Sequence, residues 1–181
     1  SSWNVSSVTN MNSMFRNADA FNQPIGDWDV SSVTYMQNMF RNADTFNQPV
    51  GDWDVSSVTY MSHMFYGAFS FNQPIGDWDV SSVTYMSYMF FAANAFNQPI
   101  GDWDVSSVTE MDYMFNGASS FNQDLSIWCV TNIAWAIAFS NQSPLIESNM
   151  PVWGTCPLTP ITDANFNQAI ETCLSTNPID G

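Results

Sequence analysis

The chain of 181 residues has no lysine and only two arginines, Arg16 and Arg41, against 17 aspartates and glutamates. Its formal net charge at pH 7 is therefore −15. Nucleic acids and anionic lipid surfaces attract proteins mainly through contacts of Lys and Arg with phosphate. A chain this poor in cations is expected to bind neither of them, whereas cations and basic partners suit its acidic surface.

Long hydrophobic runs are missing as well. The longest uninterrupted apolar stretch extends only from Ile133 to Phe139. A transmembrane helix needs about 20 such residues to cross a hydrocarbon core of roughly 30 Å. We therefore expect no insertion into a membrane.

Groups for catalysis are scarce. His63 is the only histidine, and no recognisable motif links it to a serine or cysteine nucleophile. The sequence therefore predicts a protein that is not an enzyme and that carries no cofactor, bound calcium excepted.

Cysteine is absent until Cys129, and only Cys156 and Cys173 follow it. A disulfide between Cys129 and Cys156 would tie the last repeat to the segment after it, with a loop-entropy benefit of about 3 to 4 kcal/mol. Cys173 would then be left for a partner outside the chain. A bridge between Cys156 and Cys173 fits the sequence almost as well.

What the chain does contain is one 25-residue pattern written six times. Each copy reads approximately W-D-V-S-S-V-T-x-M-x-x-M-F-x-x-A-x-x-F-N-Q-P-I-G-D. A regular repeat of this length indicates a solenoid, in which stacked units bury a continuous core that no single unit could form. The copies begin at Trp3, Trp28, Trp53, Trp78, Trp103 and Trp128.

The second copy illustrates the expected fold of a repeat. Ile25, Trp28 and Val30 follow the spacing of a leucine-rich-repeat strand. The next apolar residues have helical spacing, with Ser31 and Ser32 available as an N-cap. The sequence thus predicts an α/β repeat solenoid of six leucine-rich-repeat-like units, each with one short parallel strand and one short helix. The helical positions are Val33, Met36, Met39, Phe40 and Ala43.

The segment F-N-Q-P-I-G-D-W-D-V-S-S-V-T-Y-M-S-Y-M-F resembles the BspA-like leucine-rich-repeat surface proteins, a group that includes a repeat domain of unknown function found in mycoplasma lipoproteins. The resemblance covers residues 1 to about 130. It implies an extracellular or cell-surface array associated with adhesion and surface structure. It supplies no catalytic residues.

Three regions follow from the repeat and the resemblance. Residues 1–140 form the solenoid, with a degenerate sixth repeat, and residues 141–160 form a linker that we expect to fold back over Trp135. Residues 161–181 contain a predicted amphipathic helix at 162–174. In the resembling family, a segment of this kind precedes a repeat array as its N-terminal cap.

This order suggests that the C-terminal helix of one unit covers the first repeat of the next, in a tandem array or a head-to-tail homopolymer. A segment boundary placed arbitrarily within a longer array would explain it too. We predict an extracellular structural protein that assembles end to end into a filament or surface coat. The competing prediction is a monomeric adhesin-type module that binds carbohydrate, a surface protein or calcium. The predicted assembly residues are Trp3, Val5, Val8, Phe166, Ile170 and Leu174.

Two rows of aspartates are expected along the stack, because equivalent residues of adjacent parallel strands lie about 4.8 Å apart. Bound calcium would relieve their mutual repulsion. Alternatively, each aspartate accepts hydrogen bonds in a local Asx turn, and Asn4, in the equivalent place of the first copy, favours this explanation. The rows are Asp27, Asp52, Asp77 and Asp102, and Asp29, Asp54, Asp79 and Asp104.

Other rows come from the same periodicity. Asn22, Asn47, Asn72, Asn97 and Asn122 are expected to form an asparagine ladder that bonds loop backbone. Asn4-Val5-Ser6 is an N-glycosylation sequon. An aromatic stripe on the outer face would contact sugars or proteins, or would simply cover adjacent repeats. Its residues are Tyr35, Tyr60, Tyr85, Tyr88 and Tyr113, joined by Tyr66 and Phe91.

Overall fold

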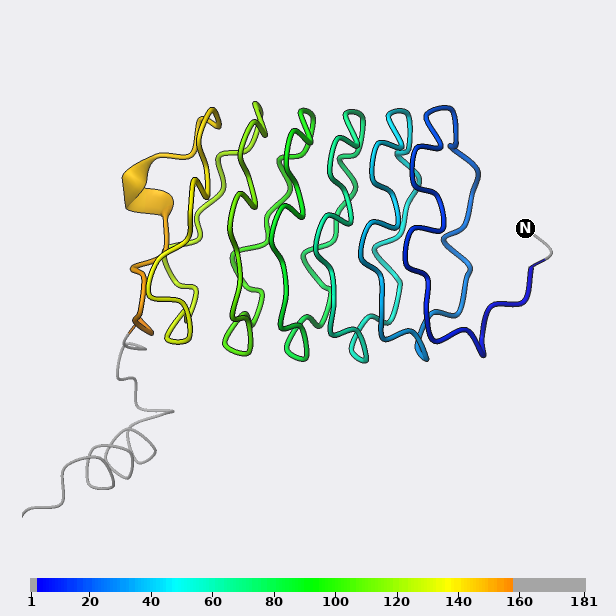
Figure 1. The fold of residues 1–181 in the computed structure, drawn as a ribbon, viewed down its shortest axis with the longest axis horizontal. Coiled ribbons are helices and arrows are strands. Elements are labelled where there is room, and N and C mark those ends of the chain that lie inside the picture. The colour runs from blue at the N-terminus through cyan, green and yellow to red at the C-terminus, as the bar shows by residue number, and fades with distance from the viewer. Residues whose placement is uncertain (1–2, 158–181) are drawn as a thin grey trace, which may run out of the picture.

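The computed structural model describes residues 3–157, in which the repeats form a row of coils stacked side by side (Figure 1). The chain advances along the stack by one coil per repeat. Residues 25 apart therefore lie next to each other in neighbouring coils, as the parallel bridge from Tyr35 to Tyr60 shows. The region 161–181, with its predicted helix, lies outside the described residues.

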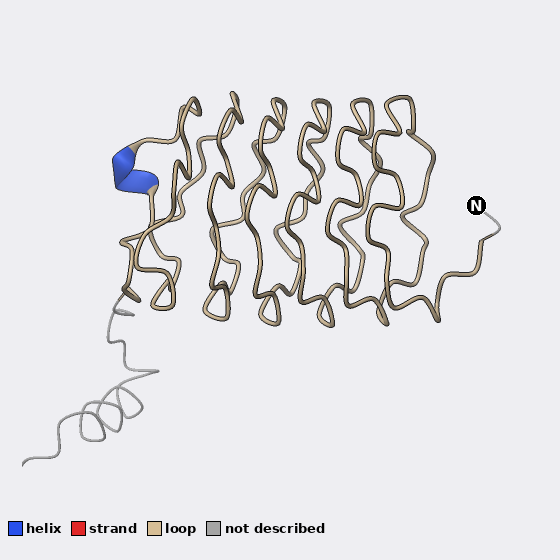
Figure 2. Ribbon diagram, in the orientation of Figure 1, coloured by secondary structure: helices blue, strands red, loops and turns tan. Residues whose placement is uncertain are grey.

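The predicted α/β solenoid with a strand and a helix in every repeat is wrong. Figure 2 shows loops and turns throughout the coils, and the only helix within residues 3–157 is the 3-10 helix η1, Glu147–Asn149. Strand pairing in this range is limited to isolated parallel bridges. These bridges fall where the periodicity predicts a helix. The bridged residues are Asn10, Tyr35, Tyr60, Tyr85 and Glu110.

Left-handed backbone positions exclude the helix. The angle φ is +57° at Asn38 and +55° at Asn42, and the equivalent residues of the other coils are also positive. A right-handed helix cannot continue through such residues. Bonds between residues three apart close a series of turns instead, such as the one from the Met39 N–H to the Met36 carbonyl (3.2 Å). Apolar residues three and four apart point inward from these turns as they would from a helix, so the periodicity alone does not separate the two structures.

In the segment 33–43 of the second coil, alternate backbone N–H groups donate to carbonyls of the next coil. In the opposite direction, the Thr59 N–H donates to the Thr34 carbonyl at 2.9 Å. The polar backbone groups around the apolar interior are thus satisfied between coils rather than within a helix. The donors of the second coil are Met36, Asn38, Phe40 and Asn42, and their acceptors, at 2.7 to 3.1 Å, are the carbonyls of Tyr60, Ser62, Met64 and Tyr66.

Columns of identical side chains fill the interior. The Trp78 indole N–H donates to the Val50 carbonyl at 3.0 Å, and the equivalent indoles of Trp53, Trp103 and Trp128 make the same bond. The large ring is therefore buried without losing a hydrogen bond. One phenylalanine column, Phe40, Phe65, Phe90 and Phe115, has ring centroids 5.5 to 5.6 Å apart. A second, Phe46, Phe71, Phe96 and Phe121, has spacings of 5.8 to 6.0 Å.

Residues 141–157 lie against the sixth coil. The ring of Trp153 meets Phe139 edge to face at 5.0 Å, and Leu145 is buried. The Leu125 N–H donates to the Asn149 carbonyl at 2.8 Å. The expectation that this segment covers Trp135 is wrong, because the Trp135 side chain is 67% exposed.

Glycine is needed where the chain leaves each Pro-Ile or Pro-Val pair. A Cβ atom at Gly76 would lie 2.6 Å from the carbonyl oxygen of Pro99 in the next coil. That oxygen belongs to backbone and cannot rotate away. The close approach of the coils therefore depends on the absence of a side chain here.

We expect Gly76→Ala to lower the free energy of unfolding by about 1 to 3 kcal/mol, because the added methyl forces neighbouring coils apart. Chemical denaturation measures the change. The matched control is Asp77→Ala, one residue further on and exposed, which is expected to change stability by less than about 0.5 kcal/mol. Equal stability of Gly76→Ala and the wild type would contradict the coil contact.

Candidate functional site

The aromatic residues of the outer surface form separate columns rather than one stripe. Tyr35, Tyr60 and Tyr85 stack with ring centroids 5.1 and 4.8 Å apart. His63, Tyr88 and Tyr113 form another column, with both spacings 4.7 Å. Tyr66 stacks on Phe91 at 4.7 Å, and these two rings also lie beside His63 and Tyr88.

Arg41 lies beside the second of these columns. The guanidinium carbon of Arg41 is 4.5 Å from the centroid of the Tyr66 ring, a cation–π contact. Arg16 occupies the same repeat position one coil earlier. We call these residues the flank cluster; its members are Arg16, Arg41, His63, Tyr66, Tyr88, Phe91 and Tyr113.

Arg16 and Arg41 are not among the residues that motifs or composition indicate as a site. The available signal is their register: Arg16, Arg41, Tyr66 and Phe91 follow one another at intervals of 25 residues. That interval places them in one column once the coils are known to stack in register.

Electrostatics in the flank cluster favour neutral His63. Burial of its ring lowers the pKa of His63 below its usual value of 6.5, and the positive charges of Arg41 and Arg16 lower it further. Burial also raises the pKa of the Tyr88 phenol, with smaller contributions from Tyr113 and Asp112. Near neutral pH the cluster therefore carries its positive charge on the arginines alone.

One aspartate row is engaged in local turns. Oδ1 of Asp79 accepts hydrogen bonds from the Ser81 N–H (3.0 Å) and the Ser81 hydroxyl (2.6 Å). Asp29 and Asp54 make the same pair of bonds, whereas Asp104 accepts from the Ser106 N–H alone. The bonds from the serines lower the pKa of Asp79. These are the Asx turns that the sequence offers as the alternative to calcium.

The other aspartate row, Asp27, Asp52, Asp77 and Asp102, lies exposed at the turns. Within residues 3–157, no group of three or more His, Cys, Asp or Glu side chains is arranged to hold a metal ion. Calcium binding along the rows stays a prediction.

The asparagine row forms a continuous ladder. Oδ1 of Asn72 accepts the backbone N–H of Asn97 at 3.0 Å and the side-chain N–H of Gln98 at 2.9 Å. The same backbone bond joins the other neighbours from Asn22 to Asn122. Asn22, Asn47, Asn72 and Asn97 thus each supply an acceptor that the next coil requires.

The first coil is the exposed end of the described stack. Trp3 is 61% exposed and Val8 is partly buried, whereas Val5 is buried. An apolar recess of about 170 Å³ opens here. It is lined by Trp3, Phe15, Phe21, Gln23, Ile25 and Trp28. The other predicted assembly residues, Phe166, Ile170 and Leu174, lie outside the described range.

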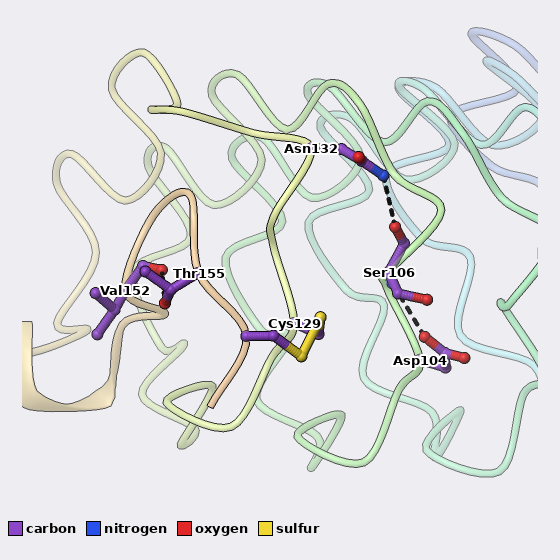
Figure 3. The surroundings of a disulfide bond; sticks show 7 residues. Asp104, Ser106, Cys129, Asn132, Val152 and Thr155 are labelled. Atoms are coloured by element: carbon purple, nitrogen blue, oxygen red, sulfur yellow. Dashed lines mark hydrogen bonds between the residues drawn. A yellow bond between two sulfur atoms is a disulfide. The ribbon is translucent and has the colours of Figure 1, made fainter. Parts of the chain in front are cut away.

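At the other end of the stack, Cys129 and Cys156 form a disulfide (Figure 3). The Val130 N–H donates to the Thr155 carbonyl at 2.8 Å beside it. The bridge and this bond fasten the segment after η1 to the sixth coil. Cys173 lies outside the described residues.

Asn4, the sequon asparagine, is exposed, and its Oδ1 accepts the Ser6 N–H at 3.2 Å and the Ser6 hydroxyl at 2.8 Å. Glycosylation at this residue stays a prediction. The part of the chain that the structure describes contains no helix with the length and apolar character needed to cross a membrane.

Comparison with protein families gives a match to a family of unknown function. The family described as "Mycoplasma protein of unknown function, DUF285" matches residues 1–93 and, in a second alignment, residues 73–173. No curated protein and no solved structure has a significant match to the chain.

The asparagine ladder predicts different effects for the same substitution in different coils. Asn72→Ala leaves the Asn97 N–H without its acceptor, and we expect a loss of about 1 to 3 kcal/mol in the free energy of unfolding. Asn122→Ala is the matched control, because no hydrogen bond to the Asn122 side chain is found within residues 3–157. Equal losses in the two variants, measured by denaturation, would contradict the ladder.

His63 predicts a pH effect on stability. Because the folded state lowers its pKa, the unfolded chain takes up the proton first as the pH falls, and stability drops below about pH 6.5. The variant His63→Asn gives the third coil the residue that the second coil has at the equivalent left-handed position, Asn38. In this variant, this part of the pH dependence should disappear. Melting temperatures between pH 7.5 and 5, a window chosen around the usual histidine pKa, test the difference. Parallel pH profiles for the two proteins would refute it.

Proposed function

We propose that this chain, which belongs to the DUF285 family of Mycoplasma proteins of unknown function, is a non-enzymatic structural protein of a cell surface, related to the BspA-like repeat proteins. Its stacks of coils meet end to end in a filament or surface coat. The disulfide between Cys129 and Cys156 supports an extracellular location, since such bonds persist in oxidising compartments.

The observation that carries this proposal is the exposed face of the first coil. Met14 is 38% exposed, whereas its equivalents Met39, Met64, Met89 and Met114 are fully buried. The same kind of surface is thus covered by a neighbouring coil at every later position in the stack. An exposed apolar face of this composition favours contact with another part of the same protein.

Backbone groups at this face support the same contact. In the second coil, the carbonyls of Tyr35, Gln37, Met39 and Arg41 accept N–H groups from the first coil. The equivalent carbonyls of Asn10, Asn12, Met14 and Arg16 have no hydrogen-bond donor among residues 3–157. Within residues 3–157 they form an open row of acceptors on the first coil, with which an added segment can pair.

A second copy supplies a surface for this face at its opposite end. Ile127, Trp135 and Val152 are 61%, 67% and 65% exposed around the sixth coil and the segment that follows it. A contact between two different ends is heterologous and does not close on itself, so it continues from copy to copy. The absence of lysine and the single histidine in an aromatic stack support a structural role rather than catalysis.

Two surface variants test this assembly. Trp3→Ser removes one end of the contact and Trp135→Ser removes the other, so each variant alone should be monomeric where the wild type forms oligomers that grow with concentration. A mixture of the two variants retains one intact junction and should form dimers only. Light scattering with size-exclusion chromatography distinguishes these species.

The control is Phe69→Ser, which removes an exposed ring from the side of the stack, where Phe69 is 45% exposed. It should oligomerise like the wild type. A wild type that stays monomeric at high concentration would refute end-to-end assembly of separate chains, and so would a mixture of variants that forms no dimer.

A further inference from the structure

The flank cluster gathers the arginines of a strongly acidic chain in one place. Arg16 and Arg41 are the only arginines, there is no lysine, and the formal net charge is −15. The two lie in adjacent coils, where the N–H of Asn17, the residue after Arg16, donates to the Arg41 carbonyl at 2.7 Å. The flank cluster is therefore a local exception to the acidic surface.

Neither arginine pairs with an acid among residues 3–157. No carboxylate lies within 4.0 Å of either guanidinium in the described residues. In a protein with seventeen acids, arginines are easily paired, and guanidiniums with no carboxylate beside them keep N–H donors for an external anion.

Arg41 is held in position by neutral groups. Its guanidinium lies over the Tyr66 ring, and one Nη donates to Oδ1 of Asn38 at 3.3 Å. Its Nε is buried and has no hydrogen-bond partner. The side chain is thus oriented before any ligand arrives. Its buried Nε is out of reach of an external ligand, so the Nη groups are the donors that remain for one. A carboxylate, which accepts two parallel N–H bonds, matches this geometry.

Two aromatic members, Tyr66 and Tyr88, have neighbours stacked over their ring faces, so their edges and hydroxyls are what remain for a ligand. Tyr66 has Arg41 on one face and Phe91 stacked 4.7 Å away, and Tyr88 lies between His63 and Tyr113 at 4.7 Å on each side. Ring edges are electropositive and attract oxygen atoms. The Tyr88 phenol can donate, because a tyrosine hydroxyl is protonated near neutral pH, and burial raises its pKa further. The surface therefore suits a ligand rich in hydroxyl groups.

The charge of the whole protein limits the charge of the ligand. A net charge of −15 repels polyanions at distances where single contacts do not yet act. A ligand with one carboxylate and an otherwise neutral, polar body experiences much less of this repulsion. Hydroxyl groups and a single carboxylate occur together in sugars of the uronic-acid class.

We propose that the flank cluster binds a sugar that carries one carboxylate, with the carboxylate on the guanidiniums of Arg16 and Arg41 and the sugar hydroxyls on the phenols of Tyr66 and Tyr88. This site lies on the side of the stack. It goes beyond the proposed end-to-end assembly and does not depend on it.

The test compares two sugars that differ only in the carboxylate. Titration of the whole chain with methyl glucuronide and with methyl glucoside, followed by NMR chemical shifts, should show at least tenfold tighter binding of the glucuronide, about the effect of one charge-assisted contact. Arg41→Gln and Arg16→Gln should each weaken glucuronide binding about tenfold. Arg41→Lys, which keeps the charge but loses the fork, should also bind more weakly than the wild type.

Matched controls separate this site from general effects. Tyr88→Phe removes a proposed hydroxyl contact and should weaken binding, whereas Tyr35→Phe, in the other tyrosine column, should not. Melting curves establish that every variant is folded. Equal affinity for the two sugars, or unchanged binding in the Arg16→Gln, Arg41→Gln double variant, would overturn the proposal. Acetate binding as tightly as the glucuronide would overturn the role of the sugar.

Discussion

The hydrogen bonds between successive coils are the constraint on which the rest of the structure depends. In each coil, alternate N–H groups leave the turn and donate to the next coil, as Met36 does to Tyr60 at 3.0 Å. This bonding works only if each coil is the same length, because one extra residue would displace every donor from its acceptor. The 25-residue period is therefore a condition for satisfying the backbone around an apolar interior.

A fixed register turns every repeat position into a column. Inside, the columns are aromatic and apolar, and the tryptophan indoles find carbonyls in the preceding coil. On the outside, the same register places like charges beside one another, and the aspartates of a row therefore repel each other. The Asx turns to Ser31, Ser56 and Ser81 give one row of carboxylates local donors and reduce this cost. The register also places Arg16 and Arg41 together although they are 25 residues apart in sequence.

The positions that differ between repeats carry the functional proposals. The four central repeats are nearly alike and mainly build the stack. Variation is concentrated at outward positions, where Asn38, His63, Tyr88 and Tyr113 occupy the same place in successive coils, and at the two ends. Trp3 has no coil beyond it among the described residues, and the sixth coil is covered by the segment fastened through Cys156. Side and end of the stack are thus separate surfaces, and each carries one of the two proposals.

Much of this protein follows from its sequence alone. The period determines that the repeats stack, and the recurring apolar positions, such as Val33, Met36 and Phe40, determine what is buried. The asparagine row also indicates its own ladder. The tertiary structure decided the rest. Val33 to Ala43 has helical spacing, yet its N–H groups bond between coils through left-handed residues such as Asn38, because neighbouring coils supply acceptors that a single repeat does not contain. The flank cluster likewise exists only after stacking, since residues 25 apart become neighbours through the fold and not through the chain.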